Sequence, residues 1–492
     1  MHLCANLANG ICDPRRLHNY GQIDSPRDDA CCVVLWMSHA QRSRENLALD
    51  VAIAAANDRA LPLIVAFRLA AGPPSNDMRH SAHMIAAFPE LIDGINARNA
   101  AFALLEPAPL DHFIATLHEL EPALVICDDD AMVGAARMRT EVGAALEVPL
   151  IAVDADVLVP SRVFIKREYA ARTLRPKFHR VLHEFDGERG GRAHVETAPA
   201  KQRPAGLGEQ LQWFAPGSSA TLDVGRLDRV LVASGIPDTA GRVQRPSGMA
   251  AAAARLRGFV DEQLNGYATN RNQPHLDATS GLSVFLHFGQ ISPHVVLDAV
   301  RGADAPAADV AAFVEEFTVR RELAVNFARS AGEAAYSLAC APDWAKLTHA
   351  AHAGDPRTSL HSEAVMLACE THDPLWNAAQ RQMLVTGTMH GYLRMYWAKQ
   401  ILTWTPSAEE AYELALGLHD RFSMDGRDPN SLTGVAWAIA GVHDRAWPER
   451  EVFGKIRSMT FASTSRKFNS AAYIARWSGD DGGGGEQQSL AL

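Results

Sequence analysis

Short apolar runs alternate with amphipathic stretches over the first third of the chain. Four such runs, at 31–38, 61–70, 123–130 and 149–160, are separated by segments with helical periodicity. Continuous runs rich in β-branched residues and bounded by turns are typical of buried parallel strands. The pattern predicts a doubly wound α/β domain with a parallel sheet over residues 28–165.

The pattern changes after residue 165. Residues 166–225 include a polar stretch rich in Gly, Pro and Glu with little periodicity, which we interpret as an interdomain connector. From 226 to 477 strand-like runs vanish and helical periodicity dominates, which predicts an all-α second domain. The end of the chain, 478–492, is rich in Gly and predicts a disordered tail.

Composition limits the function classes. The chain has 492 residues, 47% of them hydrophobic, and a net charge of −10, as expected for a folded protein of two or three domains. An acidic protein does not coat nucleic acid through bulk electrostatics, but a local basic face stays open. Residues 443–477 hold seven basic and three acidic side chains, a local net charge of +4.

The cysteines and the N-terminal sequence indicate the cellular compartment of the protein. Seven cysteines lie at scattered spacings without paired CxxC elements, which favours a reducing compartment and gives no indication of a metal site. The sequence has neither a signal-peptide pattern nor an apolar run long enough to span a membrane. We expect a monomer in the cytoplasm of a bacterial-type cell.

Tryptophan is concentrated in the helical part. Of nine tryptophans, seven lie from Trp344 onward, where an even distribution would place about three. Trp397 and Trp404 are seven residues apart, so on one helix they share a face with a rise of roughly 10 Å between them. Such a row of π-systems can pass electrons from a buried redox cofactor to the surface. Packing of a tryptophan-rich core explains the same spacing.

Six long motifs carry a family resemblance. They are LHFGQIS at 286–292, EEFTVRRELAVNF at 315–327, DPLWNAAQ at 373–380, MHGYLRMYWAKQIL at 389–402, DGRDPN at 425–430 and GVHDRAWPEREVFGKIR at 441–457. In this order they resemble a class II DNA photolyase of the cryptochrome/photolyase family. The resemblance extends from residue 36 to about residue 476.

The resemblance implies both an activity and its cofactors. It implies an α/β antenna domain, a helical domain that holds FAD, and DNA containing pyrimidine dimers as the partner. The reaction would be light-driven repair of cyclobutane pyrimidine dimers by an electron from photoexcited, reduced FAD, with the lesion flipped out of the duplex. The family also allows a second, light-harvesting chromophore, either a deazaflavin or a folate.

The resemblance also assigns the flavin site. The implied FAD-binding residues are Tyr267, Thr279, Ser280, Gly281, Leu282, Ser283, Arg394, Asp425, Asp428 and Asn430. A loop that opens a helix suits the phosphates, and a fixed cation suits an anionic flavin. Without the resemblance, TSGLS would be read as a helix N-cap and Arg394 with Asp425 as a surface ion pair. Val284 stands where the family usually has Pro.

The resemblance implies two further groups of functional residues. Trp397, Trp376 and Trp404, in that order from flavin to surface, match the family's electron relay for photoactivation. The residues implied for the lesion and DNA are Glu316, Met395, Trp437, Arg445, Trp447, Lys455 and Arg457. Glu315 is adjacent to Glu316, so one of the two carboxylates is expected to be a solvated helix residue. Core packing is the alternative for Trp437 and Met395, and a solvated basic face for the arginines.

One departure from the family concerns the flavin itself. His419 stands where the family normally has Asn, whose amide faces flavin N5. An imidazole can donate, accept or carry charge, so we hypothesise that His419, as a catalytic residue, alters which flavin redox state persists. A steric substitution without consequence is the alternative. Leu47 and the sequence SLTG at 431–434 are milder departures.

Three functions compete. Retention of the lesion-contacting residues favours a repair enzyme, whereas His419 and the Gly-rich tail leave open a cryptochrome-like blue-light photoreceptor. A repair-inactive, DNA-binding flavoprotein is the third alternative. Repair of (6-4) photoproducts is disfavoured, because that chemistry usually needs a histidine near the lesion and His419 is expected at the flavin.

Overall fold

The computed structural model describes residues 2–69, 77–191, 193–204, 207–208, 210–239 and 241–479. The chain divides into two compact units, each assembled from three segments. The first comprises Met1–Ile165, Phe178–Ala253 and Leu282–Ala299, and the second Lys166–Lys177, Ala254–Gly281 and Val300–Leu492. The predicted disordered tail, from residue 480 onward, lies outside the described residues.

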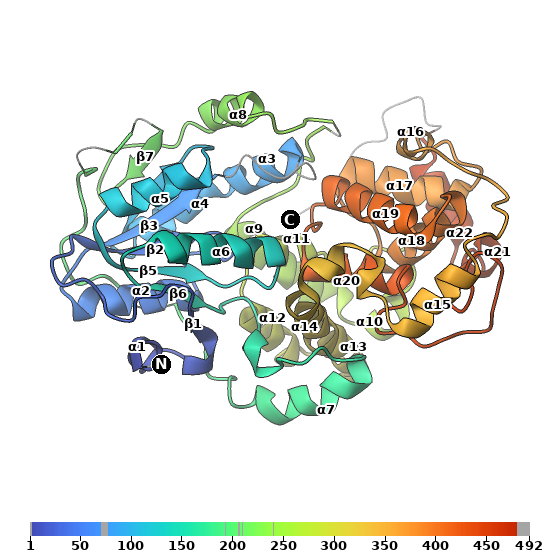
Figure 1. Ribbon diagram of the computed structural model, residues 1–492, viewed down its shortest axis with the longest axis horizontal. Helices are drawn as coiled ribbons and strands as arrows, with labels where there is room; N and C mark the ends of the chain where they lie inside the picture. The colour runs from blue at the N-terminus through green and yellow to red at the C-terminus, as the bar shows by residue number, and fades with distance from the viewer. Residues whose placement is uncertain are drawn as a thin grey trace. The chain divides into compact units, whose positions relative to one another are not determined.

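The first unit is built on a seven-stranded sheet with the order β1-β6-β5-β2-β3-β4-β7 (Figure 1). The strands are β1 Leu17–Asn19, β2 Cys32–Met37, β3 Leu63–Arg68, β4 Ala101–Leu105, β5 Pro122–Asp128, β6 Leu150–Val153 and β7 Leu211–Phe214. The five inner strands pair in parallel, while β1 and β7 pair antiparallel at the two edges. The predicted apolar runs therefore form the buried parallel strands.

Helices cover both faces of this sheet. They are α1 His2–Ala8, α2 Leu47–Asp58, α3 Met78–Ala86, α4 Phe88–Asn96, α5 Leu110–Glu119, α6 Val133–Ala145 and α8 Val224–Ala233. The third segment adds α11 Ser283–His287 and α12 Pro293–Arg301 to this unit. Val33 and Leu35 pack with α2 and α4, and Val34 and Trp36 with α5 and α6. Alternate residues of a strand point to opposite faces, so each face buries its own core.

The stretch expected as a connector is more ordered than its sequence suggests. It carries α7 Ala171–Leu182 and strand β7, which pairs with β4 from Phe102 to Leu105. Part of residues 166–225 therefore belongs to the sheet. The four-residue strand LQWF is too short for its alternation to stand out among Gly and Pro.

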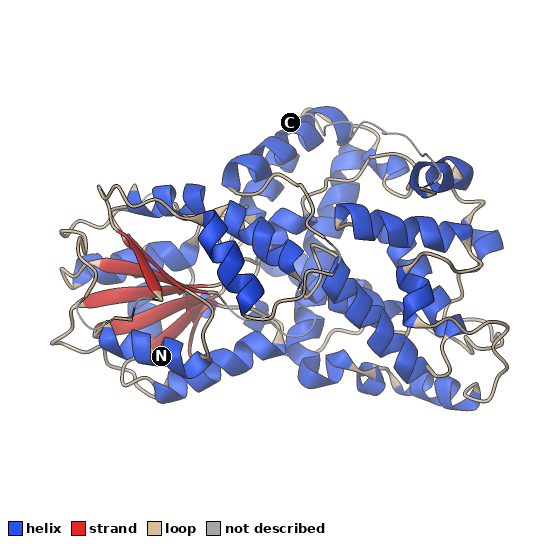
Figure 2. Cartoon of the chain, turned by 90° about the horizontal axis from the view of Figure 1, so that it is seen from above, coloured by secondary structure: helices blue, strands red, loops and turns tan. Residues whose placement is uncertain are grey.

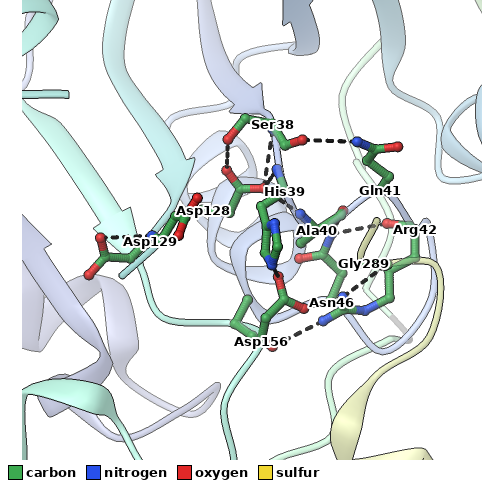
Figure 3. A network of polar contacts seen from close by, with 12 residues as sticks. Ser38, His39, Ala40, Gln41, Arg42, Asn46, Asp128, Asp129, Asp156 and Gly289 are labelled. Carbon is green, nitrogen blue, oxygen red and sulfur yellow. Dashed lines mark hydrogen bonds and ion pairs between the residues drawn. The ribbon is translucent and has the colours of Figure 1, made fainter. Parts of the chain in front are cut away.

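The carboxyl ends of β2 and β5 are tied together by polar contacts (Figure 3). The Asp128 carboxylate accepts hydrogen bonds from the backbone N–H groups of Ser38, His39 and Ala40, and from the Ser38 hydroxyl at 2.6 Å. Arg42 follows in the same loop and pairs with Asp156. These buried carboxylates hold the chain that follows β2 in place.

The second unit is helical, and the strands in Figure 2 are confined to the first. Its helices are α10 Tyr267–Asn270, α13 Ala307–Glu315, α14 Arg321–Ala331, α15 Asp343–Ala351, α16 Glu363–Leu367, α17 Pro374–Thr386, α18 Gly391–Trp404, α19 Ala408–Phe422, α20 Pro429–Ala438, α21 Phe461–Thr464 and α22 Ser470–Trp477, with α9 Met249–Gly258 divided between the units. Within the described ranges, no helix is long and apolar enough to cross a membrane.

Helices α13 and α14 are joined without a break by a π-helical turn, Glu316–Arg320. A π-helical turn contains one more residue than an α-helical turn, so it rotates the side chains that follow it about the helix axis. Such turns are frequent at functional sites. Here the turn begins at Glu316, one of the two adjacent carboxylates that the sequence could not distinguish.

Candidate functional site

Three tryptophans of the second unit form a continuous aromatic stack. The rings of Trp376 and Trp397 are nearly parallel, at 8°, with centroids 6.1 Å apart. Trp404 meets Trp376 edge to face at 5.3 Å. Trp376, contributed by α17, thus lies between two residues of α18, in the order that the resemblance implied. All three side chains are buried, with only 3% of Trp404 exposed.

The start of α17 fixes the middle ring of this stack. Asp373 caps the helix, and its side chain accepts from the N–H groups of Leu375 and Trp376 at 2.9 and 3.0 Å. The same carboxylate accepts from the hydroxyl of Tyr396 on α18. The Trp376 ring nitrogen donates to the Trp397 carbonyl at 3.0 Å. One buried carboxylate therefore joins the start of α17 to α18.

A buried ion pair lies one helical turn before Trp397. Arg394 Nη2 is 3.1 Å from Asp425 Oδ1, and Ser423 donates to the same oxygen at 2.6 Å. Arg394 Nε is buried without a hydrogen-bond partner in the protein. A buried guanidinium N–H without an acceptor is costly, so a polar ligand or an ordered water would stabilise it here.

His419 on α19 is fully buried beside this pair. Its Nδ1 lies 2.7 Å from the Ser431 hydroxyl, which donates to Asp420 at 3.1 Å. Because Ser431 has one proton to give, it accepts from His419 Nδ1–H, which leaves Nε2 unprotonated. His419 Nε2 has no partner in the protein. Burial, together with Arg394, lowers the pKa of His419 to about 3, so the imidazole is neutral and presents an acceptor.

Three more of the implied flavin residues, Asp428, Asn430 and Tyr267, lie in two further places. Asp428 caps α20 and accepts from the N–H of Asn430 at 2.8 Å. Tyr267 is buried against Phe259 and Phe313, with ring centroids 5.7 and 5.5 Å away.

The implied phosphate loop, residues 279–283, lies over Arg255 in the second unit. Arg255 donates to the carbonyl oxygens of Ser280 at 2.7 Å and Thr279 at 2.9 Å. Gly281 has a φ of +64°, and a Cβ there would lie 2.9 Å from Arg255 Nε, so the turn requires glycine. Leu282 and Ser283 follow as the start of α11, in the first unit.

Five of the seven implied lesion and DNA residues line one cavity of about 1100 Å³ in the second unit, namely Glu316, Met395, Trp437, Trp447 and Arg457. Arg445 and Lys455 are exposed residues of the loop that carries Trp447. The cavity wall is apolar at Met395 and Trp437 and acidic at Glu316, and it includes both neutral polar and basic side chains. The further basic residues on it are Arg271, Arg320, Arg450 and Lys467.

The two adjacent carboxylates point to different partners. Glu316 lines the cavity and pairs with Arg271 at 2.9 Å. Glu315 instead forms a pair with Arg175 on α7 at 2.6 Å. Adjacent residues on a helix point about 100° apart, which gives the two carboxylates different partners. Glu316, as expected, is the carboxylate at the cavity.

Cations and aromatic rings alternate along one side of the cavity. Lys399 Nζ lies 4.8 Å from the Trp437 ring centroid. Arg457 lies 5.9 Å from the Trp437 ring and 4.7 Å from that of Trp447, on which Arg445 also stacks at 5.1 Å. Such contacts hold large side chains in place without closing the cavity. Lys455, exposed in the same loop, donates its backbone N–H to Thr348.

The comparisons decide the family. A photolyase of Methanothermobacter thermautotrophicus named deoxyribodipyrimidine photo-lyase is 36% identical over 90% of this chain and 94% of its own length. A protein of the same name from Potorous tridactylus is 38% identical over 91% of this chain and 81% of its own. The DNA photolyase family model matches residues 33–202. The chain belongs to the DNA photolyase family.

Solved structures confirm the predicted fold of this photolyase family member. A class III photolyase from Agrobacterium tumefaciens superimposes with a TM-score of 0.67 at 18% identity, covering 93% of this chain and 88% of its own. A cryptochrome from Synechocystis gives the same TM-score at 13% identity, covering 91% and 88%. At these identities the likeness concerns the α/β and helical architecture alone.

Sequence reasoning missed two groups at the photolyase site. Lys399 is fully buried beneath Trp437 and donates to the Ala438 carbonyl at 2.7 Å, although a lysine in a helix is usually solvated. His361 and His372 contact Trp404 from loops, where no hydrophobic periodicity predicts which side chains lie together. The only signal for Lys399 was its position two residues after Trp397 within an apolar helix.

Proposed function

We propose that this protein repairs cyclobutane pyrimidine dimers in DNA, driven by light, as a class II photolyase. The observation that carries the proposal is the cavity in which Glu316, Met395, Trp437 and Trp447 converge. Relatives named deoxyribodipyrimidine photo-lyase at 36% and 38% identity support the activity. The six motifs and the order of the tryptophan stack support the class.

The residues present fit FAD. Two buried nitrogens without protein partners, Arg394 Nε and His419 Nε2, offer one donor and one acceptor beside an ion pair. Arg394, Asp425, His419 and Asn430 would hold the ring system, and the loop 279–283 the phosphates. When bound, FAD supplies a photoexcitable flavin that donates one electron in its reduced form.

The chain's own groups would bind and orient the lesion. Trp437 and Met395 offer an apolar platform, and Glu316, held by Arg271, is placed to hydrogen-bond the flipped bases. Trp447, supported by two arginines, would occupy the gap left in the duplex. Arg445, Lys455 and Arg457 are placed to contact phosphates.

The stack of Trp397, Trp376 and Trp404 would carry electrons inward for photoactivation. The centroids of neighbouring rings are 6.1 and 5.3 Å apart, so each ring is in contact with the next. The apolar burial of Trp376 and Trp397 keeps water from both rings.

One experiment tests repair. The protein is loaded with FAD, reduced in the dark, mixed with an oligonucleotide that contains one thymine dimer, and exposed to blue light. We expect light-dependent recovery of thymines, reduced by about 10²-fold or more in Glu316→Ala if that carboxylate orients the bases. Binding without recovery would instead favour the DNA-binding flavoprotein, and neither binding nor recovery would favour a receptor.

His419 is the one observation that keeps the blue-light receptor as a second candidate. A neutral imidazole acceptor at this place differs from the family's amide, which can both donate and accept. We expect His419→Asn to change the photoreduction spectra and their decay in the dark, measured by absorption under blue light. Identical spectra and decay would show that the histidine is a steric substitution.

A further inference from the structure

Two histidines cluster at the outer end of the tryptophan stack. His361 Nε2 and His372 Nδ1 are 2.8 Å apart, within hydrogen-bonding distance, and the two rings are tilted by 29° with centroids 5.1 Å apart. Both belong to loops: His361 precedes α16, and His372 precedes the Asp373 cap of α17.

Both imidazoles pack against Trp404. The ring of His361 meets the indole perpendicularly at 5.1 Å, and that of His372 at 5.3 Å and 66°. The His361 backbone N–H also donates to the Trp404 carbonyl at 3.1 Å. Trp404 is 3% exposed, whereas His372 is exposed. The pair therefore touches the buried indole on one side and reaches solvent on the other.

The pair has one vacant basic nitrogen. Two neutral imidazoles carry one N–H each, and one of these N–H groups forms the bond between the rings. Of the two outer nitrogens, one then carries the second proton and the other has a free lone pair. Burial and the neighbouring His372 lower the pKa of His361, which favours this neutral form.

A tryptophan that has lost an electron becomes a much stronger acid at its indole N–H. Only 3% of Trp404 is exposed, so the indole has little contact with bulk water, and a base beside it in the protein would speed the loss of its proton. A cavity of about 520 Å³ is lined by both Trp404 and His361 and has room for a bridging water. The histidine pair is the neutral base at this position.

We propose that the His361–His372 pair accepts the indole proton of Trp404 during photoactivation and later returns it. This inference rests on the proposed relay. Trp404 passes one electron to Trp376, its N–H bond breaks, and an N–H bond forms on the vacant imidazole nitrogen. When an external thiol supplies one electron and is itself oxidised, the proton moves back to the indole. Charge and protons at Trp404 are then restored.

Flash photolysis of the FAD-loaded protein tests the proposal. After a blue flash, the band of the tryptophan radical cation should convert to that of the deprotonated radical, with a rate that falls in heavy water. In His361→Gln and His372→Gln we expect this conversion to slow by roughly 100-fold. Free imidazole should restore the rate in His372→Gln. The matched control is His118→Gln, an exposed histidine on α5, which should convert like the wild type.

The outcomes separate this inference from the relay on which it rests. If the flash yields no tryptophan radical that disappears in Trp404→Phe, the relay itself is wrong. If that radical forms but converts equally fast in both histidine variants, the histidine pair is not the acceptor. Since His372 is exposed, its variant is expected to fold, and flavin absorbance checks that each variant binds FAD. Slow conversion without imidazole rescue would point to a packing defect and overturn the proposal.

Discussion

At the residue scale, burial determines the protonation states at the two proposed sites. His419 is fully buried and neutral, with a hydroxyl and a carboxylate behind it that fix which nitrogen carries the proton. Lys399 is equally buried, and burial together with Arg457 lowers its pKa to about 7 against the opposing effect of Asp444. Lys399 therefore changes charge in the range in which a cell operates.

The titration of Lys399 should affect lesion binding. Protonated Lys399 lies over the Trp437 ring and holds it in place, and this contact weakens as pH rises through about 7 and the ammonium loses its proton. We expect the affinity for dimer-containing DNA to fall by roughly 2- to 5-fold across this range, measured by fluorescence anisotropy in the dark. Lys399→Met should bind weakly at both ends of the range. Lys346→Met, at an exposed position on α15, should keep the wild-type profile, and an unchanged profile in Lys399→Met would refute the role.

At the element scale, the sequence predicts long elements and misses those that depend on distant contacts. Four of the five parallel strands follow from continuous apolar runs, because a strand buried on both faces is apolar throughout, and the helical domain follows from its periodicity. Strand β4 is not among the predicted runs. Strand β7 is missed too, because its four residues are stabilised by pairing with β4, more than a hundred residues away. The same holds for the site. The motif around Glu316 is visible in the sequence, but the π-helical turn that begins there is not.

The cap of α17 links an element boundary to the proposed relay. Asp373→Ala removes the acceptor for two backbone N–H groups and leaves the buried Tyr396 hydroxyl without its partner. We expect a loss of about 2–4 kcal/mol in the free energy of unfolding and slower photoreduction, because Trp376 is no longer held between its neighbours. Thermal unfolding and flavin bleaching under blue light measure the two effects.

The control for this prediction is the cap of α19. Ser407→Ala removes two exposed hydrogen bonds, one accepted from the N–H of Glu410 and one donated to its carboxylate, and should cost only about 1 kcal/mol. It should leave photoreduction unchanged, because Ser407 lies outside the stack. If Asp373→Ala loses stability yet photoreduces at the wild-type rate, the cap stabilises the helix without serving the relay.

At the scale of the whole molecule, a chain with a net charge of −10 can bind DNA because its basic side chains are concentrated around one cavity. The cavity wall and the loop beside it gather basic side chains, among them Arg445, Arg450, Lys455, Arg457 and Lys467. The acidic remainder repels DNA at long range, so binding should depend on a few short-range phosphate contacts.

Salt titration measures these contacts. Each phosphate neutralised on duplex DNA contributes about 0.9 to the slope of log affinity against log salt concentration. Arg445 is exposed and stacks on Trp447, so Arg445→Gln should lower that slope by about one and weaken binding to damaged and undamaged duplexes alike. Arg27→Gln, in the first unit, removes an exposed arginine paired with Asp29 and should leave the slope unchanged. An equal loss of slope in both variants would mean that binding follows overall charge, and the basic surface at the cavity would then not be the DNA-binding face.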